Sequence, residues 1–423
     1  MSSSKLSVPS VWALAAGGMV GGGIYTVLGV VIAAAGQWTW LGFLLTGIIA
    51  LASAYSYASL SNKFNESGGA FGFLEELDDK NIGGNIAWLL ILGYIFTISV
   101  YCYAFGHYLS FAFHGTPMLT RGLAIGITIG LIMLNLSGVG KMTKVEITIV
   151  SVNLLILLGL GIYGLTQWDS HQLTSGIAPK PAWASLIGGA AIFMAYEGFQ
   201  LLTYEYDKIK NPEKIFVPTL VSAVGCVIFI YIIVSVGATM LGGAYDLVSF
   251  KQVALSVAAK KTFGQTGLWV MTIAAGFATT AAINSTLFST ASLSRSIANR
   301  KELPQWFSHT NSNDVPDRAV ILIGSLAGIL AVIGSLSALV EAASVVFLIT
   351  FGTVNLLAYR NLEKRRWIPV TGIAFTLLIG LALIGRLIIT KPIALTGLVV
   401  VSLLIILGRP YLLKITGTKD DQD

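Results

Sequence analysis

Runs of about 20 apolar residues, separated by short charged or Pro/Gly-containing breaks, fill almost the whole chain. A helix of roughly that length crosses the hydrocarbon core of a bilayer, which is about 30 Å thick. Of the 423 residues, 55% are hydrophobic and only 11% are charged, whereas an ordinary soluble domain has roughly 25% charged residues. The sequence therefore predicts an all-α integral membrane protein whose surroundings are the lipid bilayer. Its net charge of +6 is explained by topology and gives no reason to expect a nucleic-acid partner.

Twelve transmembrane helices are predicted from the apolar runs. They lie near residues 10-35, 39-61, 83-112, 122-139, 146-166, 183-203, 217-241, 266-293, 319-336, 339-359, 367-389 and 393-412. With both termini inside, 19 of the 26 Lys and Arg residues fall on inner loops or tails and 7 on outer ones. Because cytoplasmic loops carry the excess of positive charge, we expect cytoplasmic termini and a multi-pass protein of the plasma membrane. No long insertion divides the chain, so residues 1-423 are expected to form one integral membrane domain.

Two of the predicted spans are interrupted. Residues 17–23 read GGMVGGG inside the first span, and Glu197-Gly198-Phe199 lies inside the sixth. Breaks in the first and sixth helices are typical of two five-helix inverted repeats. The predicted repeats are 10-166 and 183-359, followed by two extra helices in 367-412.

Three consecutive glycines remove side-chain cover and helix propensity together, so the backbone can unwind and present bare N–H and C=O groups. A substrate carboxylate can dock there, facing the positive N-terminal end of the half-helix that starts near Ile24. Small residues also allow two helices to pack closely. The glycines alone do not separate a binding site from tight packing.

Five segments in order carry a family resemblance. They are Gly17 to Gly29 (GGMVGGGIYTVLG), Ser67 to Phe73 (SGGAFGF), Asn135 to Lys144 (NLSGVGKMTK), Phe193 to Pro218 (FMAYEGFQLLTYEYDKIKNPEKIFVP), and Asn284 to Pro304, which ends in ANRKELP. Through them the sequence resembles the amino acid-polyamine-organocation superfamily over most of its length. The resemblance implies a five-plus-five inverted-repeat permease that works by alternating access and holds an amino acid or a closely related amine at the unwound parts of helices 1 and 6.

Site residues follow from the resemblance by position. It implies that the substrate carboxylate meets Gly21, Gly22 and Gly23, and that carbonyls of Met19 and Val20 lie near the amine. On helix 6 the matching stretch is Met194, Ala195, Tyr196, Glu197, Gly198 and Phe199. Many relatives close the outer gate with a bulky aromatic residue near the position of Met194, so Tyr196 or Phe199 is expected to act as the gate here.

Glu197 is the only acidic residue predicted to lie deep in a span. A carboxylate at membrane depth costs at least about 2.5 kcal/mol on insertion scales, so water, a partner or a ligand must meet it. Three roles remain open: it pairs with a cationic amine of the substrate, it carries a coupled proton, or it caps backbone N–H groups of the broken helix. Glu341 and Arg386, near span ends, are expected to reach the interface.

The coupling ion is not decided by the sequence. Many members of this fold place a cation, or the ammonium of a helix-5 lysine, between helices 1 and 8, and the resemblance puts Asn153 where that lysine would be. The predicted linkage residues are Gly17, Asn153, Ser285 and Ser289. A sodium ion, a proton carried by Glu197 and uncoupled exchange all remain candidates; no cofactor and no certain metal site is expected.

Two other classes of function were weighed. The chain contains no G-x-x-x-x-G-K-[ST] phosphate loop, so we expect transport to be driven by a H⁺ or Na⁺ gradient or by exchange. An amino acid-binding membrane sensor without transport is the alternative, although only about ten residues follow the last span. An enzyme is not expected, because neither an H-E-x-x-H motif nor a Ser-His-Asp set at membrane depth is present. Of the span-3 tyrosines Tyr94, Tyr101 and Tyr103, at most one is expected to face the pathway.

Overall fold

A computed structural model describes residues 5–65, 67–75, 80–138 and 143–416. Within these ranges the chain is helical, and the one β pairing is an isolated bridge between Leu6 and Ile209. The predicted all-α class is therefore confirmed. Residues 139–142 of the Asn135 to Lys144 segment and both chain ends lie outside the described residues.

Long helices occupy the predicted spans. They are α1 (Val8–Val20), α2 (Gly23–Ala35), α3 (Thr39–Phe64), α5 (Lys80–Ala112), α6 (Pro117–Leu136), α7 (Thr143–Thr166), α9 (Pro212–Gly242), α11 (Ala254–Asn299), α12 (Asp317–Ile333), α13 (Leu336–Asn361), α14 (Trp367–Thr390) and α15 (Pro392–Ile415). The sixth span consists of α8 (Ala184–Ala191) and two 3₁₀ segments, η3 (Phe193–Tyr196) and η4 (Phe199–Lys208). The short connecting elements are η1 (Gly36–Trp38), α4 (Gly69–Glu75), η2 (Ser170–Leu173), α10 (Ala244–Ser249) and η5 (Gln305–Ser308).

In the described part of the chain, nine helical segments are long and apolar enough to cross a membrane, or ten if the bent pair in the sixth span counts as one. One of these segments, Val8–Phe64, has 57 residues, which at about 1.5 Å per residue is roughly 85 Å and too long for a single crossing. A multi-pass membrane protein is confirmed. The number of twelve spans stays a prediction.

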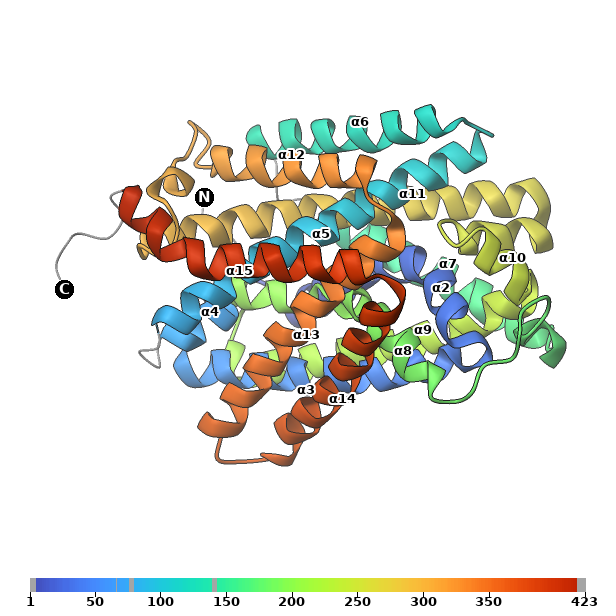
Figure 1. Ribbon diagram of the computed structural model, residues 1–423, viewed down its shortest axis with the longest axis horizontal. Coiled ribbons are helices and arrows are strands. Elements are labelled where there is room, and N and C mark those ends of the chain that lie inside the picture. Colours follow the sequence, from blue (N-terminus) through green and yellow to red (C-terminus); the bar gives the residue numbers. More distant parts are fainter. Residues whose placement is uncertain (1–4, 66, 76–79, 139–142, 417–423) are drawn as a thin grey trace.

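The connection before the eighth span consists of α10, a break, and then the start of α11. The backbone of α11 is non-helical at Gly264, where φ is +60°. Figure 1 shows α10 at one end of the helical bundle, opposite the end that carries α4 and the last turns of α15.

Small residues allow α7 and α9 to cross with their backbones in contact. A Cβ added at Gly164 would lie 2.1 Å from the carbonyl oxygen of Gly237, and one added at Gly237 would lie 2.1 Å from the carbonyl oxygen of Gly161. In lipid, where hydrophobic burial does not drive helix association, such contacts hold helices together. The glycines on this crossing therefore serve packing.

We expect Gly237→Ala to destabilise the protein by about 1–3 kcal/mol, because the added methyl group can be accommodated only by separating two backbones. Thermal unfolding of purified protein in detergent measures the effect. Gly126→Ala on α6 is the matched control, since nothing lies within 4 Å of an added Cβ there. Equal melting temperatures for the two variants would contradict this account of the crossing.

Two ionic clusters are buried within the helical bundle, and neither contains Glu197. Glu341 is 1% exposed and pairs with Arg386 at 3.1 Å and with Lys391 at 2.9 Å. The carboxylate is buried because α13 and α14 pack around it and bring the cations to it. That Glu341 and Arg386 lie at the level of the interface stays a prediction.

The second cluster joins the last helix to the rest of the bundle. Arg409 of α15 is 2% exposed, forms an ion pair with Glu302 and donates from Nη1 to Asn85 Oδ1 at 3.1 Å. Its guanidinium fills the space beside Gly84, where an added Cβ would lie 2.0 Å from Nη2. Most other side chains of α15 are exposed. Arg409 is therefore its principal polar attachment to α5.

Arg409→Met is expected to lower stability by about 3 kcal/mol or more, because it leaves the Glu302 carboxylate buried without its cation. The double variant Glu302→Gln/Arg409→Met removes both charges and should recover most of the loss. Melting temperature and monodispersity in detergent report both effects. A double variant no more stable than Arg409→Met would show that the charge pair is not what attaches α15.

Candidate functional site

The first break separates α1 from α2 by only two residues, Gly21 and Gly22. The space beside Gly22 and the following Gly23 is filled by tyrosine side chains from other helices. A Cβ at Gly22 would lie 2.0 Å from Cε1 of Tyr101, and one at Gly23 would lie 2.4 Å from the hydroxyl of Tyr231. The glycines thus bring two phenol rings against the unwound backbone.

The sixth span bends by 58° at Ile192, between α8 and the segment Phe193–Lys208. The second break lies further along this segment at Gly198, whose φ of +126° is in a region that residues with a side chain rarely adopt. A Cβ at Gly198 would lie 2.3 Å from the carbonyl carbon of Gly18, so the two broken helices touch through their backbones. The structure therefore brings together the two segments that the sequence placed about 180 residues apart.

Glu197 lies at this contact and is 1% exposed. Its Oε2 accepts from the Tyr101 hydroxyl at 3.4 Å, and its Oε1 accepts from Gln200 Nε2 at 3.2 Å. The backbone N–H of Gly198 is capped instead by Gln200 Oε1 at 2.8 Å. None of the described Lys, Arg or His side chains forms an ion pair with Glu197. It is therefore a buried carboxyl group held by neutral donors.

A line of polar contacts runs from Glu197 to a cavity. Gln200 Nε2 also donates to the Tyr94 hydroxyl at 3.3 Å, and the hydroxyls of Tyr94 and Tyr204 are 3.2 Å apart. Tyr204 lines a cavity of about 510 Å³, whose wall also includes Ser67 and Gly68 just before α4. The buried carboxyl group is thus separated from this cavity by two tyrosines and one amide.

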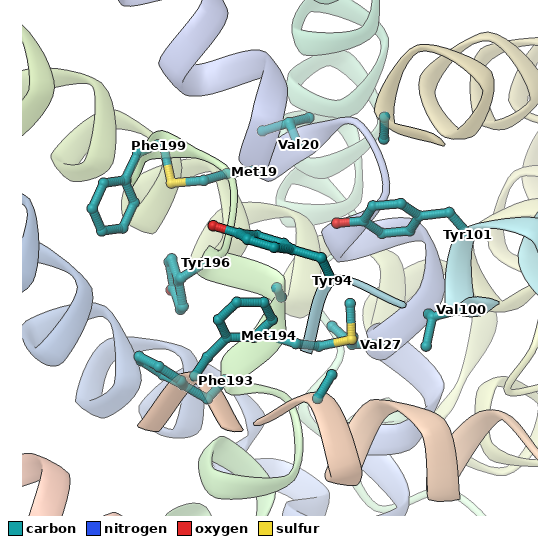
Figure 2. Close-up of a cluster of buried hydrophobic side chains, with 14 of the residues drawn as sticks. Met19, Val20, Val27, Tyr94, Val100, Tyr101, Phe193, Met194, Tyr196 and Phe199 are labelled. Carbon is teal, nitrogen blue, oxygen red and sulfur yellow. The ribbon is translucent and has the colours of Figure 1, made fainter. Parts of the chain in front are cut away.

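The two expected gate residues are fully buried. The Tyr196 hydroxyl donates to the carbonyl of Phe43 at 2.8 Å, and the ring of Phe199 packs edge-on against Tyr57 at 6.1 Å. Figure 2 shows both rings in one cluster with Met19 and Met194. The other expected contact residues, Val20 and Ala195, are also buried there.

Residues from α1, α7 and α11 meet at a second, much smaller cavity of about 10 Å³, roughly the room that one water molecule needs. Three of the four predicted linkage residues line it: Gly17, Asn153 and Ser285. The fourth, Ser289, lies on the wall of the 510 Å³ cavity instead. Asn153 is 4% exposed and accepts from the Tyr25 hydroxyl at 3.2 Å, so it joins α7 to α2.

Sequence reasoning missed part of this site. Tyr94 and Tyr101 both join the network, although at most one span-3 tyrosine was expected to face the pathway. Figure 2 shows both rings in one cluster. Their spacing of seven residues, about two helical turns, places them on one face of α5 and could have indicated this. Tyr231 had no signal in the sequence, because a tyrosine within an apolar span resembles an ordinary packing residue.

Comparison with known proteins identifies the family of this chain. The family model described as amino acid permease matches residues 6–412. The chain belongs to this family. The permease is 28% identical to the inner membrane transport protein YbaT of Escherichia coli, over 84% of its own length and 83% of that protein. It is 26% identical to cationic amino acid transporter 3, mitochondrial, of Arabidopsis thaliana, over 82% of its length and 61% of that transporter.

Solved structures identify the fold of the permease. The crystal structure of MhsT in complex with L-phenylalanine matches with a TM-score of 0.63 and 16% identity, over 89% of the permease and 97% of MhsT. The Eremococcus coleocola manganese transporter matches with a TM-score of 0.59 and 14% identity, over 96% and 94% of the two chains. These likenesses confirm the five-plus-five transporter fold with broken helices. With its family and its relatives, they make the permease a secondary transporter.

We expect Gly198→Ala to reduce substrate uptake by at least about tenfold, because the new methyl group would meet the Gly18 carbonyl group and a left-handed φ disfavours alanine. Initial uptake rates in reconstituted liposomes give the effect. Gly225→Ala on α9 is the control, since the nearest atom to its added Cβ is 4.0 Å away. Uptake by Gly198→Ala at the rate of Gly225→Ala would refute a functional role for the contact between the two breaks.

Proposed function

We propose that the permease moves an amino acid or a closely related amine across the plasma membrane by alternating access, with the substrate held between the two helix breaks and a proton carried on Glu197. The proposed substrate contacts are the residues Met19, Val20, Gly21, Gly22, Gly23, Ala195, Tyr196, Glu197, Gly198 and Phe199. Both termini are proposed to be cytoplasmic, and the two inverted repeats to be 10-166 and 183-359. The 510 Å³ cavity is then the cytoplasmic side of the pathway.

The observation that carries the proposal is the chemistry around Glu197. An ionised carboxylate without a cation is expensive to bury, and two neutral donors compensate only part of that cost. Binding of a proton neutralises the Glu197 carboxylate, and the carboxyl group then stays in contact with both Tyr101 and Gln200. Among the described residues, the other two buried carboxylates, Glu302 and Glu341, have cationic partners, so Glu197 differs from them in needing a proton from solution to become neutral.

Contacts toward the cavity support exchange of that proton with the cytoplasm. Only Gln200, Tyr94 and Tyr204 lie along the line of hydrogen bonds between Glu197 and the cavity wall. A small movement of the two tyrosines, whose hydroxyls meet at 3.2 Å, is enough to admit water to the carboxyl group. The same opening gives the substrate a path to the cytoplasm.

Sodium coupling is supported less well by the linkage cavity. Apart from Asn153, Ser285 and Thr286, the lining residues of this 10 Å³ cavity are Gly, Ala, Val and Ile, and Asn153 Oδ1 already accepts from Tyr25. Hard cations are held by several oxygen atoms. We therefore expect uptake that depends on a pH gradient and is unchanged when potassium replaces sodium.

Uptake of radiolabelled amino acids into liposomes, measured with imposed pH or sodium gradients, tests the proposed function. The wild type is expected to accumulate at least one amino acid when the outside is acidic. Glu197→Gln is neutral at every pH, so we expect it to lose the stimulation by the pH gradient. Glu213→Gln, at an exposed acidic residue in the first turn of α9, is the matched control and should keep it.

Distinct outcomes contradict distinct parts of the proposal. If the wild type accumulates no amino acid or amine under any gradient, the substrate class is wrong. If Glu197→Gln keeps the full pH-gradient response, the carboxyl group does not carry the proton. A Glu197→Gln variant that instead changes its preference from cationic to neutral amino acids would assign Glu197 to the substrate side chain.

A further inference from the structure

One buried tyrosine joins the two helix breaks directly. Tyr231 of α9 is 0% exposed, and its hydroxyl lies 2.8 Å from the carbonyl oxygen of Met19 and 2.9 Å from that of Ala195. Met19 is in the last turn of α1, and Ala195 is in η3, just before the second break. A single side chain from outside both broken helices therefore contacts a carbonyl group of each.

The hydroxyl of tyrosine has one hydrogen, which it shares between these two acceptors. Both carbonyls belong to helix ends, where the following residues no longer continue the hydrogen-bond ladder. Because both oxygens lie within hydrogen-bonding distance of one atom, their separation cannot exceed the sum of those two distances. Each carbonyl oxygen keeps a second lone pair that the tyrosine does not use.

We propose that Tyr231 is a positioning residue that holds the carbonyls of Met19 and Ala195 together as a pair of acceptors for the substrate ammonium; this inference rests on the proposed function. An ammonium group donates to carbonyl oxygens at about 2.8–3.0 Å, nearly the distances that the Tyr231 hydroxyl shows. Two oxygens that one hydroxyl can bridge are therefore two oxygens that one ammonium nitrogen can bridge.

The surroundings of Tyr231 keep its hydroxyl in place. Its ring packs against Phe43 at 5.4 Å and against Tyr196 at 5.2 Å between ring centroids. A Cβ at Gly23 would lie 2.4 Å from the hydroxyl and 2.7 Å from the Ala195 oxygen. Gly23, at the start of α2, therefore leaves the space in which the Tyr231 hydroxyl contacts the Ala195 carbonyl oxygen.

The pair of acceptors selects a class of amine. A primary or secondary ammonium has at least two N–H bonds and satisfies both oxygens. An N,N-dimethylammonium has one N–H bond, so one of the two carbonyls is left without a donor. A quaternary ammonium has no N–H bond and can donate to neither carbonyl. The permease is thus expected to discriminate by the number of N–H bonds on the amine, and Tyr231 to be required for that discrimination.

The experiment compares uptake inhibition by L-alanine, N-methyl-L-alanine and N,N-dimethyl-L-alanine, with the same series of L-leucine in parallel so that side-chain size does not decide the result. In the wild type, the dimethyl compound should require about tenfold higher concentration than the parent amino acid, since one hydrogen bond to a charged group is lost. In Tyr231→Phe, the concentration of the parent amino acid that gives half-maximal uptake should rise about tenfold, with the maximal rate changing less. The ratio of the inhibitory concentration of the dimethyl compound to that of the parent should fall toward one.

Tyr108→Phe is the matched control. Its hydroxyl is equally buried and donates to the backbone carbonyl of Tyr25 at 2.9 Å, away from the second break, so the variant should keep the wild-type ratio. Gly23→Ala is a second test that retains Tyr231 and displaces its hydroxyl from Ala195. It should lower the same ratio even if Tyr231→Phe does not fold.

The outcomes are separable. An unchanged ratio in Tyr231→Phe or Gly23→Ala, or the same fall in Tyr108→Phe, overturns the positioning role. A wild type that transports the amino acids but does not discriminate against the dimethyl compounds overturns the two-acceptor site while leaving the proposed function intact. A wild type that takes up no amino acid contradicts the proposed function itself.

Discussion

Backbone groups left unpaired at two helix breaks inside the bilayer impose the main constraint on this structure. Water is not available there, so each exposed N–H and C=O needs a partner from the protein or a ligand. Tyr231 contacts the carbonyls of Met19 and Ala195, and the Gln200 side chain caps the N–H of Gly198. Side chains that satisfy the breaks thus also surround the proposed substrate site.

Close approach of the two broken helices follows from this constraint. Gly18 and Gly198 touch through their backbones, so one helix cannot move at its break without affecting the other. Glycine serves different purposes in different places: at the crossing of α7 and α9 it permits stable packing, whereas at the breaks it admits tyrosine side chains to the backbone. A count of glycines does not distinguish these uses, because both need the same absence of a side chain.

The buried carboxylates of the described residues differ in whether a cationic side chain is paired with them. Glu302 and Glu341 have arginine or lysine partners and join helices to one another. Glu197 has only neutral hydrogen-bond donors among the described residues, and it lies at the contact between the breaks. Burial alone therefore does not distinguish Glu197 from the other buried carboxylates; the lack of a compensating cation does.

The sequence by itself determined the membrane class, most helix boundaries and the positions of both breaks, because apolar run length and glycine placement are local properties. It also selected Glu197 and three residues of the linkage cavity. Only the tertiary structure decided that Glu302 and Glu341 are paired, that Ser289 lies on the 510 Å³ cavity, and that Tyr231 bridges the breaks. These facts depend on which helices pack together, and residues from distant helices acquire a shared role only when packing brings their polar atoms within hydrogen-bonding distance.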